Sequence, residues 1–324
     1  MNARDLNNQG ALLHAQGDLA GARLAYDQAL ALDPDDATAL NNLGFLLAQT
    51  GDLEGGIAHY RRALQIAPER STVYSNLGGA LALLDDMDAA FDALSAAVRL
   101  DPDNFSAWDA LAQCCMAVNQ PEDGERAACE ALRLRPQTAR LHTLLGTLIA
   151  LQGRLTEAIP AFQRAIALDP RHARAWSQWG VIAFMRQDFG TATDCLMRAL
   201  EIAPDDVEAR YHLALLSAGR GDSQTARALL DDLLIIDPDF TDARVDLAVL
   251  LLSVGETTAA LDHLTAAAKN SPDSPRIRYY YAAALAQSGD RETAGAIMGD
   301  LAANDPDGKY GGMARAFLEQ ETAS

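Results

Sequence analysis

The sequence predicts an all-α protein, a solenoid of stacked helix–turn–helix repeats. Three observations predict it: prolines recur every 34 residues, small residues recur at fixed positions between them, and alanine and leucine supply most of the apolar content. Unbroken periodicity of this length is the signature of a repeat protein, and alanine and leucine favour helix over sheet. The periodic prolines are Pro34, Pro68, Pro102, Pro136, Pro170, Pro204, Pro238, Pro272 and Pro306.

Counting residues so that the periodic proline occupies position 32 divides the chain into nine repeats. Their expected bounds are 3–36, 37–70, 71–104, 105–138, 139–172, 173–206, 207–240, 241–274 and 275–308. Residues 309–324 follow, and Met313 and Phe317 lie four apart on one helical face of that segment. We therefore expect 309–324 to be a C-terminal capping helix that covers the last repeat.

Each repeat carries signals for two helices. Position 15 is glycine in six repeats, and glycine suits the left-handed conformation that ends a helix. Aspartate often follows at position 16 and is a good N-cap for the second helix, which runs to the periodic proline. The caps expected for the next first helix are Asp36, Asn104, Thr138, Asp206 and Ser274. Pro160 falls inside a second helix, where we expect it to bend the helix.

Position 8 is always glycine or alanine, and so is position 20. Glycine within a helix costs about 0.5–1 kcal/mol relative to alanine, so a repeated glycine indicates close approach of two helix backbones. A large apolar residue precedes it at position 7, and an aromatic residue or leucine usually stands at position 24. Repeat 2 carries the pattern most fully, in Leu43, Gly44, Tyr60, Ala63 and Pro68.

This pattern resembles the tetratricopeptide repeat over residues 3–308, with mild departures at Gln9 and Ala128. The resemblance implies a right-handed α-solenoid superhelix. Positions 4, 7, 8 and 11 of the first helix form its packing stripe, so positions 2, 5, 6, 9, 12 and 13 lie on the opposite side. In the tetratricopeptide family these opposite positions line a concave groove, where we look for a binding site.

The N-terminal part of the expected groove is rich in amides. Position 6 is Asn8, Asn42 and Asn76 in three successive repeats. Stacked amides can bond the backbone of an extended peptide whatever its side chains are, and this series resembles the asparagine ladder of the O-GlcNAc transferase superhelix. The alternative is that an asparagine here is merely a common variant of the repeat.

The middle of the chain is basic. Eight arginines and only two carboxylates lie between Arg133 and Arg186, in a chain of net charge −19. Arg140 and Arg174 both occupy position 2, so we expect them to stack in the groove and face an acidic or phosphorylated partner segment. The other arginines are expected at solvated helix ends.

The C-terminal part of the groove is apolar and aromatic. Phe184, Tyr211, Tyr279 and Tyr280 fall at groove positions, and exposed apolar residues in a line mark a contact surface. The alternative is that these side chains bury one another.

Other classes of function find no support. The net charge of −19 argues against general nucleic-acid binding, and no apolar run is long enough to span a membrane. The first ten residues contain no apolar run, so we expect no signal peptide and a cytoplasmic protein. The Asp-Pro-Asp strings lack the glycine and glutamate of a calcium loop, and the four cysteines, expected to be buried, lack zinc spacing. No catalytic motif occurs, so we expect no enzyme, no metal and no cofactor.

The sequence thus predicts a non-enzymatic interaction scaffold that holds an extended peptide segment of another protein, with acidic and apolar residues, in its concave groove. It favours no oligomeric state. Two alternatives stay open: an assembly or regulatory subunit of an enzyme complex that acts through its outer surface, and the separate substrate-recognition arm of a protein glycosyltransferase.

Overall fold

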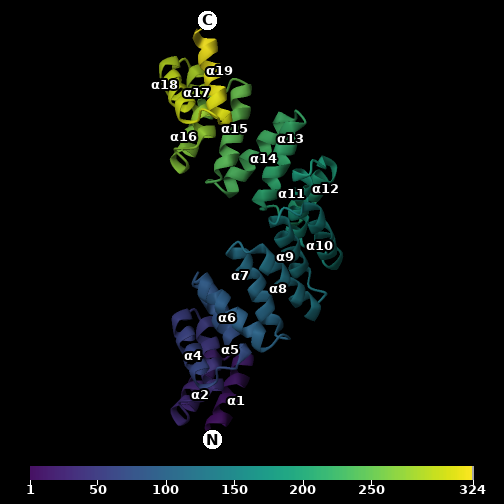
Figure 1. Ribbon diagram of the computed structural model, residues 1–324, viewed down its shortest axis with the longest axis vertical. Helices are drawn as coiled ribbons and strands as arrows, with labels where there is room; N and C mark the ends of the chain where they lie inside the picture. The colour runs from purple at the N-terminus through teal and green to yellow at the C-terminus, as the bar shows by residue number, and fades with distance from the viewer. Residues whose placement is uncertain (323–324) are drawn as a thin grey trace. The chain divides into compact units, whose positions relative to one another are not determined.

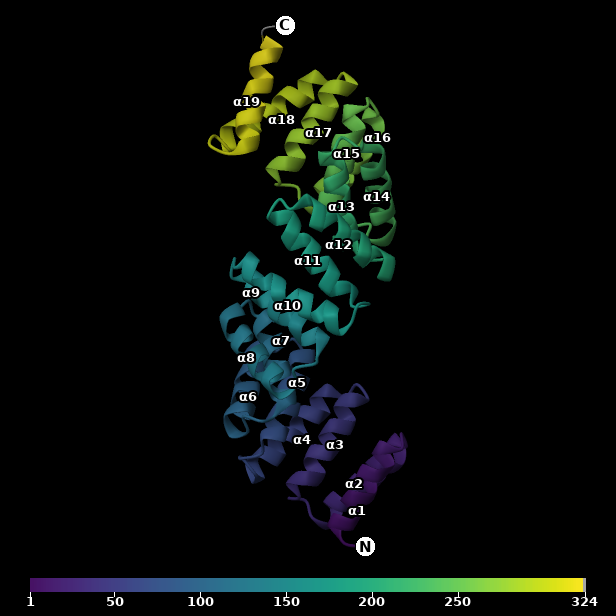
Figure 2. The ribbon, with the colours of Figure 1, turned by 90° about the vertical axis from the view of Figure 1, so that its right-hand side faces the viewer.

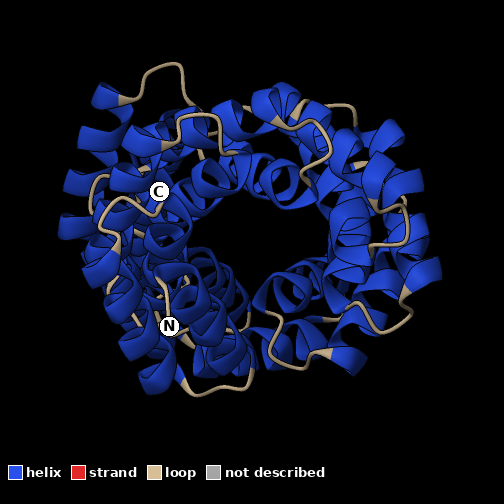
Figure 3. Ribbon diagram, turned by 90° about the horizontal axis from the view of Figure 1, so that it is seen from below, coloured by secondary structure: helices blue, strands red, loops and turns tan. Residues whose placement is uncertain are grey.

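The computed structural model describes residues 1–322, which form helices joined by short loops, with no strand among them (Figure 3). The chain divides into two compact units, residues 1–175 (unit 1) and Trp176 onward (unit 2). Each unit is a stack of antiparallel helical hairpins (Figure 1). The predicted all-α solenoid architecture is confirmed in each unit.

Unit 1 contains five hairpins, each made of a first and a second helix that pack together (Figure 2). Each first helix also contacts the first helix of the next hairpin, so α1, α3, α5, α7 and α9 lie side by side. The hairpins are α1 (Ala3–Ala15) with α2 (Leu19–Leu32), α3 (Ala37–Gln49) with α4 (Leu53–Ile66), α5 (Ser71–Leu83) with α6 (Met87–Leu100), α7 (Phe105–Ala117) with α8 (Pro121–Leu134), and α9 (Ala139–Leu151) with α10 (Leu155–Leu168). The α10 helix continues unbroken through Pro160.

Unit 2 continues the same pattern from α11 (Ala173–Met185), whose first residues belong to unit 1. Its other helices are α12 (Phe189–Ile202), α13 (Val207–Gly219), α14 (Ser223–Ile236), α15 (Thr241–Ser253), α16 (Thr257–Asn270), α17 (Pro275–Ser288), α18 (Arg291–Asn304) and α19 (Lys309–Thr322). The α19 helix packs on α17 and α18 and buries Ala314 in the same core as Met298. Residues 323–324 of the expected capping helix lie outside the described residues.

Position 15 adopts a left-handed conformation in every repeat. The six glycines have positive φ angles, and Asp85, Asn119 and Gln187 do as well, at 63°, 55° and 61°. A residue with a Cβ pays about 1–2 kcal/mol for this conformation. The turn that separates the two helices is therefore a property of the whole repeat, and glycine is its least strained residue.

Replacing Gln187 by glycine is expected to stabilise unit 2 by about 1 kcal/mol, because glycine adopts this φ without a Cβ clash. Urea unfolding followed by circular dichroism measures the change. Gly153→Ala makes the reverse substitution at the same position, where φ is 77°, and is expected to destabilise unit 1. Stabilisation by the alanine, or destabilisation by the glycine, would contradict this account of the turn.

Most expected caps form. The side chains of Asp36, Asn104 and Asp206 accept hydrogen bonds from backbone N–H groups in the first turns of α3, α7 and α13. Thr138 and Ser274 stand at cap positions but make no such bond. The hydroxyl of Thr138 instead donates to the carbonyl oxygen of Arg135, at 3.1 Å.

The helices of a hairpin approach each other closely where position 8 meets position 24. A Cβ added to Gly146 would lie 2.7 Å from Cε1 of Phe162, a fully buried ring. Gly44 meets the buried ring of Tyr60 in the same way. Glycine at position 8 thus makes room for a large side chain from the second helix, which explains the recurrence of glycine inside a helix.

In several hairpins a side chain of the first helix donates a hydrogen bond to the carbonyl oxygen of the preceding periodic proline. The indole Nε1 of Trp108 donates to the carbonyl oxygen of Pro102 at 2.8 Å, and Nε2 of His142 donates to that of Pro136 at 2.9 Å. Both donors occupy position 4 of their repeats. A polar side chain on the packing stripe therefore satisfies a backbone carbonyl of the loop that joins two hairpins.

Candidate functional site

The asparagine side chains of unit 1 form a connected hydrogen-bond network, but the residues in it are only partly the ones that the sequence predicted. Nδ2 of Asn76 donates to Oδ1 of Asn41 at 3.0 Å, and Nδ2 of Asn42 donates to Oδ1 of Asn7 at 3.0 Å. Nδ2 of Asn41 also lies 3.4 Å from Oδ1 of Asn42, which links the two pairs. Asn8 is exposed, and its side chain makes no hydrogen bond within the described residues. The amides at position 5 therefore join those at position 6 across α1, α3 and α5.

Replacing Asn41 by alanine removes the middle member of this network and is expected to lower the free energy of unfolding by about 1–2 kcal/mol, because its half-buried partners lose their bonds. Asn8→Ala is the matched control, and its effect is expected within about 0.5 kcal/mol. Urea unfolding of the two variants measures both. Equal effects would show that the network adds nothing to stability.

The two predicted arginines border one cavity of about 130 Å³ in unit 1. Arg140 belongs to α9, and Arg174 lies at the start of α11. Gln113 and Met116 of α7, Thr143, Leu144 and Thr147 of α9, and His172 complete the lining. Arg140 and Arg174 were expected to lie close together on the groove side of the first helices, and the structure places both at this cavity.

The two guanidiniums differ in their pairing. Arg140 forms an ion pair with Asp109, whose side chain is only 17% exposed. Arg174 is exposed, and its guanidinium makes no ion pair or hydrogen bond within the described residues. One of the two cations is thus already partly compensated by a carboxylate, and the other is not.

His172 adds no charge to this cavity at neutral pH. Burial lowers the pKa of His172, and the charges of Arg174 and Arg140 lower it further, although Asp169 raises it. Its Nε2 is buried and has no hydrogen-bond partner among the described residues. The positive charge of the cavity therefore comes from the two arginines alone.

The aromatic residues of unit 2 lie in two places. Phe184 borders a cavity of about 310 Å³, together with Phe189, Leu215 and Arg220. Phe189 is 46% exposed at this cavity, and Met185, which follows Phe184 in the chain, is 58% exposed. Tyr279 and Tyr280 instead form a cluster with Tyr310 of α19, with ring centroids 5.3–6.2 Å apart.

Tyr211 belongs to a polar network that the sequence did not predict. Its hydroxyl donates to Oδ2 of Asp246 at 2.8 Å, and Arg276 forms ion pairs with both Asp246 and Asp242. Burial and the Asp246 charge raise the pKa of Tyr211, and burial raises the pKa of Asp246 against the lowering effect of Arg276. The ring of Tyr211 packs on Phe240 at a centroid distance of 5.1 Å. Its hydroxyl is thus engaged, and only part of its ring is exposed.

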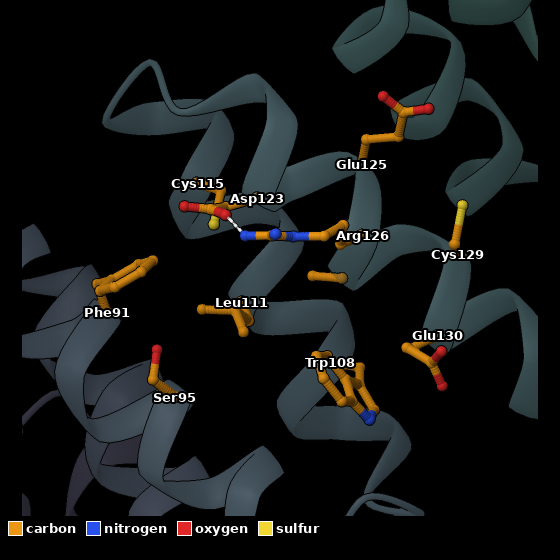
Figure 4. A pocket seen from close by; sticks show the side chains of 11 residues that line it. Phe91, Ser95, Trp108, Leu111, Cys115, Asp123, Glu125, Arg126, Cys129 and Glu130 are labelled. Carbon is orange, nitrogen blue, oxygen red and sulfur yellow. Dashed lines mark hydrogen bonds and ion pairs between the residues drawn. The ribbon is translucent and has the colours of Figure 1, made fainter.

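A further cavity, of about 660 Å³, lies between α6, α7 and α8 (Figure 4). Its lining comes from the packing stripe of α7 and from the second helices on either side, so it is separate from the positions predicted to bind. Cys115 and Cys129 both border it. Cys129 is exposed, so the expectation that all four cysteines are buried is wrong for this one. The side chain of Cys129 is exposed because it borders this cavity.

Within residues 1–322, no group of three or more histidine, cysteine, aspartate or glutamate side chains is arranged to hold a metal ion. Nor does that part of the chain contain a helix with the length and apolar character needed to cross a membrane.

Sequence reasoning missed Asp109, Gln113 and Arg276, although all three occupy groove positions: 5, 9 and 2 of their repeats. Reading every groove position in every repeat, rather than selecting residue types by zone, would have found them. His172 carries no such signal, because position 34 is a loop position.

Comparison with known proteins agrees with the fold. The TPR repeat model matches residues 10–51, and tetratricopeptide repeat models match residues 35–103, 110–173, 150–218 and 251–316. The sequence matches none of the curated proteins.

Three solved structures are similar. The APC/C hetero-tetramer Cut9-Hcn1 aligns with a TM-score of 0.63 at 18% identity, over 82% of this chain but 52% of that one. PilF of Pseudomonas aeruginosa aligns with a TM-score of 0.60 at 18% identity, over 68% of this chain and 96% of that one. MamA of Desulfovibrio magneticus RS-1 aligns with a TM-score of 0.50 at 21% identity, over 53% and 97%. Together with the matches along the sequence, this identifies the chain as a member of the tetratricopeptide repeat family.

Proposed function

We propose that the chain is a non-enzymatic protein-interaction scaffold, and that unit 1 holds an extended, acidic segment of a partner protein along its first helices. We call this surface the first-helix face; it consists of positions 2, 5, 6, 9, 12 and 13 of the first helices. Asn8, Asn42 and Asn76 would bond the backbone of the segment, and Arg140 and Arg174 would bind a carboxylate or phosphate on it.

One observation carries the proposal: the two arginines border a common cavity, and one of them has no partner within the described residues. An exposed, uncompensated guanidinium beside a second one suits bidentate recognition of an anion. The amide network supports the course of the segment, because α1, α3 and α5 belong to the same row of adjoining first helices as α9. Asn42 and Asn76 each keep hydrogen-bonding capacity beyond the bonds described, and Asn8 keeps all of its own.

In unit 2 the proposed contacts are apolar. The cavity beside Phe184 would take an apolar side chain, and the exposed parts of Tyr211, Tyr279 and Tyr280 would provide aromatic contact area. The tyrosine clusters supply these rings with fixed orientations, which lowers the entropy cost of binding.

Selection from a library of random peptides displayed on phage tests the proposal. Wild-type protein is expected to enrich peptides rich in aspartate and glutamate, and the double variant Arg140→Gln/Arg174→Gln is expected to lose that enrichment. The second-helix double variant Arg61→Gln/Arg164→Gln removes the same charge elsewhere and serves as the control. Enrichment of the same peptides by all three proteins would refute the proposed site.

A further inference from the structure

The cavity between α6, α7 and α8 has the size and walls of a binding pocket. Its volume of about 660 Å³ falls within the range of about 300–1,000 Å³ that is typical of ligand sites. Phe91 and Ser95 of α6 face it from one side, Arg126 and Glu130 of α8 face it from the other, and Leu111 of α7 lies between them (Figure 4). None of its lining residues occupies a position of the first-helix face, so the pocket is separate from that face.

Aromatic rings make up much of the apolar wall. The indole of Trp108 is held by its 2.8 Å hydrogen bond to the carbonyl oxygen of Pro102, so the ring keeps its orientation with no ligand present. Phe91 is half-buried and packs against the same core, and Leu111 is 7% exposed. Fixed rings of this kind favour an aromatic ligand group, because offset and edge-to-face pairs add about 0.5–1.5 kcal/mol to area burial.

The helices around the pocket carry excess negative charge. α6 and α8 together contain six carboxylates and three arginines. Asp123, Glu125 and Glu130 line the pocket and pair with Arg126, Arg154 and Arg133 respectively. Asp92 and Glu122 make no ion pair within the described residues. A cationic group that approaches these helices would therefore be attracted by their net negative charge and by the faces of the rings.

The two thiols at the pocket do not suit it for covalent chemistry. Burial raises the pKa of Cys115 to about 11, and partial desolvation of the Cys129 sulfur together with the charges of Glu125 and Glu130 raises the pKa of Cys129. Both thiols are thus protonated at neutral pH and behave as small apolar groups. The pocket therefore suits non-covalent binding.

We propose that this pocket is a second partner-binding site, which takes an aromatic side chain of a partner protein flanked in sequence by lysine or arginine. Its wall accounts for the aromatic group, and the carboxylates of α6 and α8 account for the flanking cations. The proposal does not depend on the first-helix face, which would bind a segment of opposite charge.

The test uses two peptides that differ only in charge, acetylated and amidated Ala-Lys-Phe-Lys-Ala and Ala-Glu-Phe-Glu-Ala. Each is titrated into the full chain while the tryptophan indole N–H resonances are followed by NMR. The Trp108 resonance is identified by its loss in Trp108→Phe. Trp176 and Trp179 lie in unit 2 and serve as internal references.

The basic peptide is expected to shift the Trp108 resonance and to bind about fivefold more tightly than the acidic one. Ser95→Phe fills the pocket from α6 and should abolish the shift, whereas Gln65→Phe adds the same ring at an exposed site on α4 and should not. Glu130→Lys should weaken the basic peptide roughly threefold, with Glu54→Lys on α4 as the matched control.

Equal binding of the two peptides, or a shift that survives Ser95→Phe, would overturn the proposal. If Ser95→Phe fails to fold, the Glu130→Lys variant, at a partly exposed position, decides the question alone: an unchanged preference for the basic peptide then refutes the proposal. Sedimentation of the wild-type chain tests whether a second copy of this chain occupies the pocket instead of a partner protein. Self-association that Ser95→Phe abolishes would assign the pocket to a second copy of this chain instead.

Discussion

Replacing Phe162 by alanine is expected to lower the free energy of unfolding by about 3–5 kcal/mol, which is the largest effect of any single substitution considered for stability. The ring is fully buried between the two helices of its hairpin. No other side chain can fill the space, because position 8 opposite it is Gly146 and carries no side chain. Urea unfolding followed by circular dichroism measures the loss.

A double-mutant cycle isolates the contact between these two positions. Gly146→Ala alone is expected to cost about 1–3 kcal/mol, because the new Cβ would lie 2.7 Å from the Phe162 ring. In a Phe162→Leu background it should cost at least about 1 kcal/mol less. Repeats 7 and 8 contain that combination, as Ala214 with Leu230 and Ala248 with Leu264, all of them buried.

Gly79→Ala is the matched control for the cycle. Gly79 also lies within a first helix, but a Cβ there would meet no atom within 4 Å. The added methyl group is therefore expected to stabilise α5 by about 0.5–1 kcal/mol through helix propensity. Equal losses from Gly146→Ala and Gly79→Ala would contradict the explanation of the periodic glycine.

Reversing the charge of both arginines at the small cavity is expected to weaken an acidic peptide selected on the wild type by roughly tenfold to a hundredfold. A hydrogen bond to a charged group contributes about 1.5–3 kcal/mol, and Arg140→Glu/Arg174→Glu both removes such bonds and repels the ligand. Fluorescence anisotropy of the labelled peptide measures the change. At about 1 M salt the difference should shrink, because the Debye length falls to about 3 Å.

The control for this prediction is Arg61→Glu/Arg164→Glu, which makes the same change in net charge on the second helices α4 and α10. It should leave affinity within a factor of about two, since exposed distant charges are screened. An equal loss in the two double variants would mean that net charge, and not the cavity, governs the interaction.

The hairpins could be predicted from the sequence because their signals are local. The periodic proline, the turn at position 15 and the cap that follows it each depend on a few neighbouring residues. Two helices also form in the repeats where Asp85, Asn119 or Gln187 replaces the glycine, because the repeat imposes a left-handed conformation on these residues despite their Cβ. The prediction that the side chains of Thr138 and Ser274 cap their helices was wrong. Both residues stand at the N-cap position, but neither side chain accepts a hydrogen bond from a backbone N–H of the first turn.

The details of the surfaces could not be predicted, because they depend on how neighbouring helices are rotated. Adjacent residues of a helix point about 100° apart, so only the packing of α1 on α3 decides that Asn7, and not Asn8, accepts the bond from Asn42. Tyr211 and Asp246 are 35 residues apart and meet only because α13 and α15 are placed by the stack. The pocket between α6, α7 and α8 depends on how far apart α6 and α8 lie, and no sequence motif indicates that distance.

Photo-crosslinking tests most directly whether a partner segment lies extended along the first helices of unit 1. Benzoylphenylalanine is placed at Asn8, at Gln113 beside the two arginines or, as a control on α4, at Glu54, and irradiated with the selected acidic peptide. The account predicts that Asn8 and Gln113 crosslink to opposite ends of the peptide, and that Glu54 does not crosslink. Crosslinks at Glu54 alone, or at the same peptide residue from both first-helix sites, would contradict it.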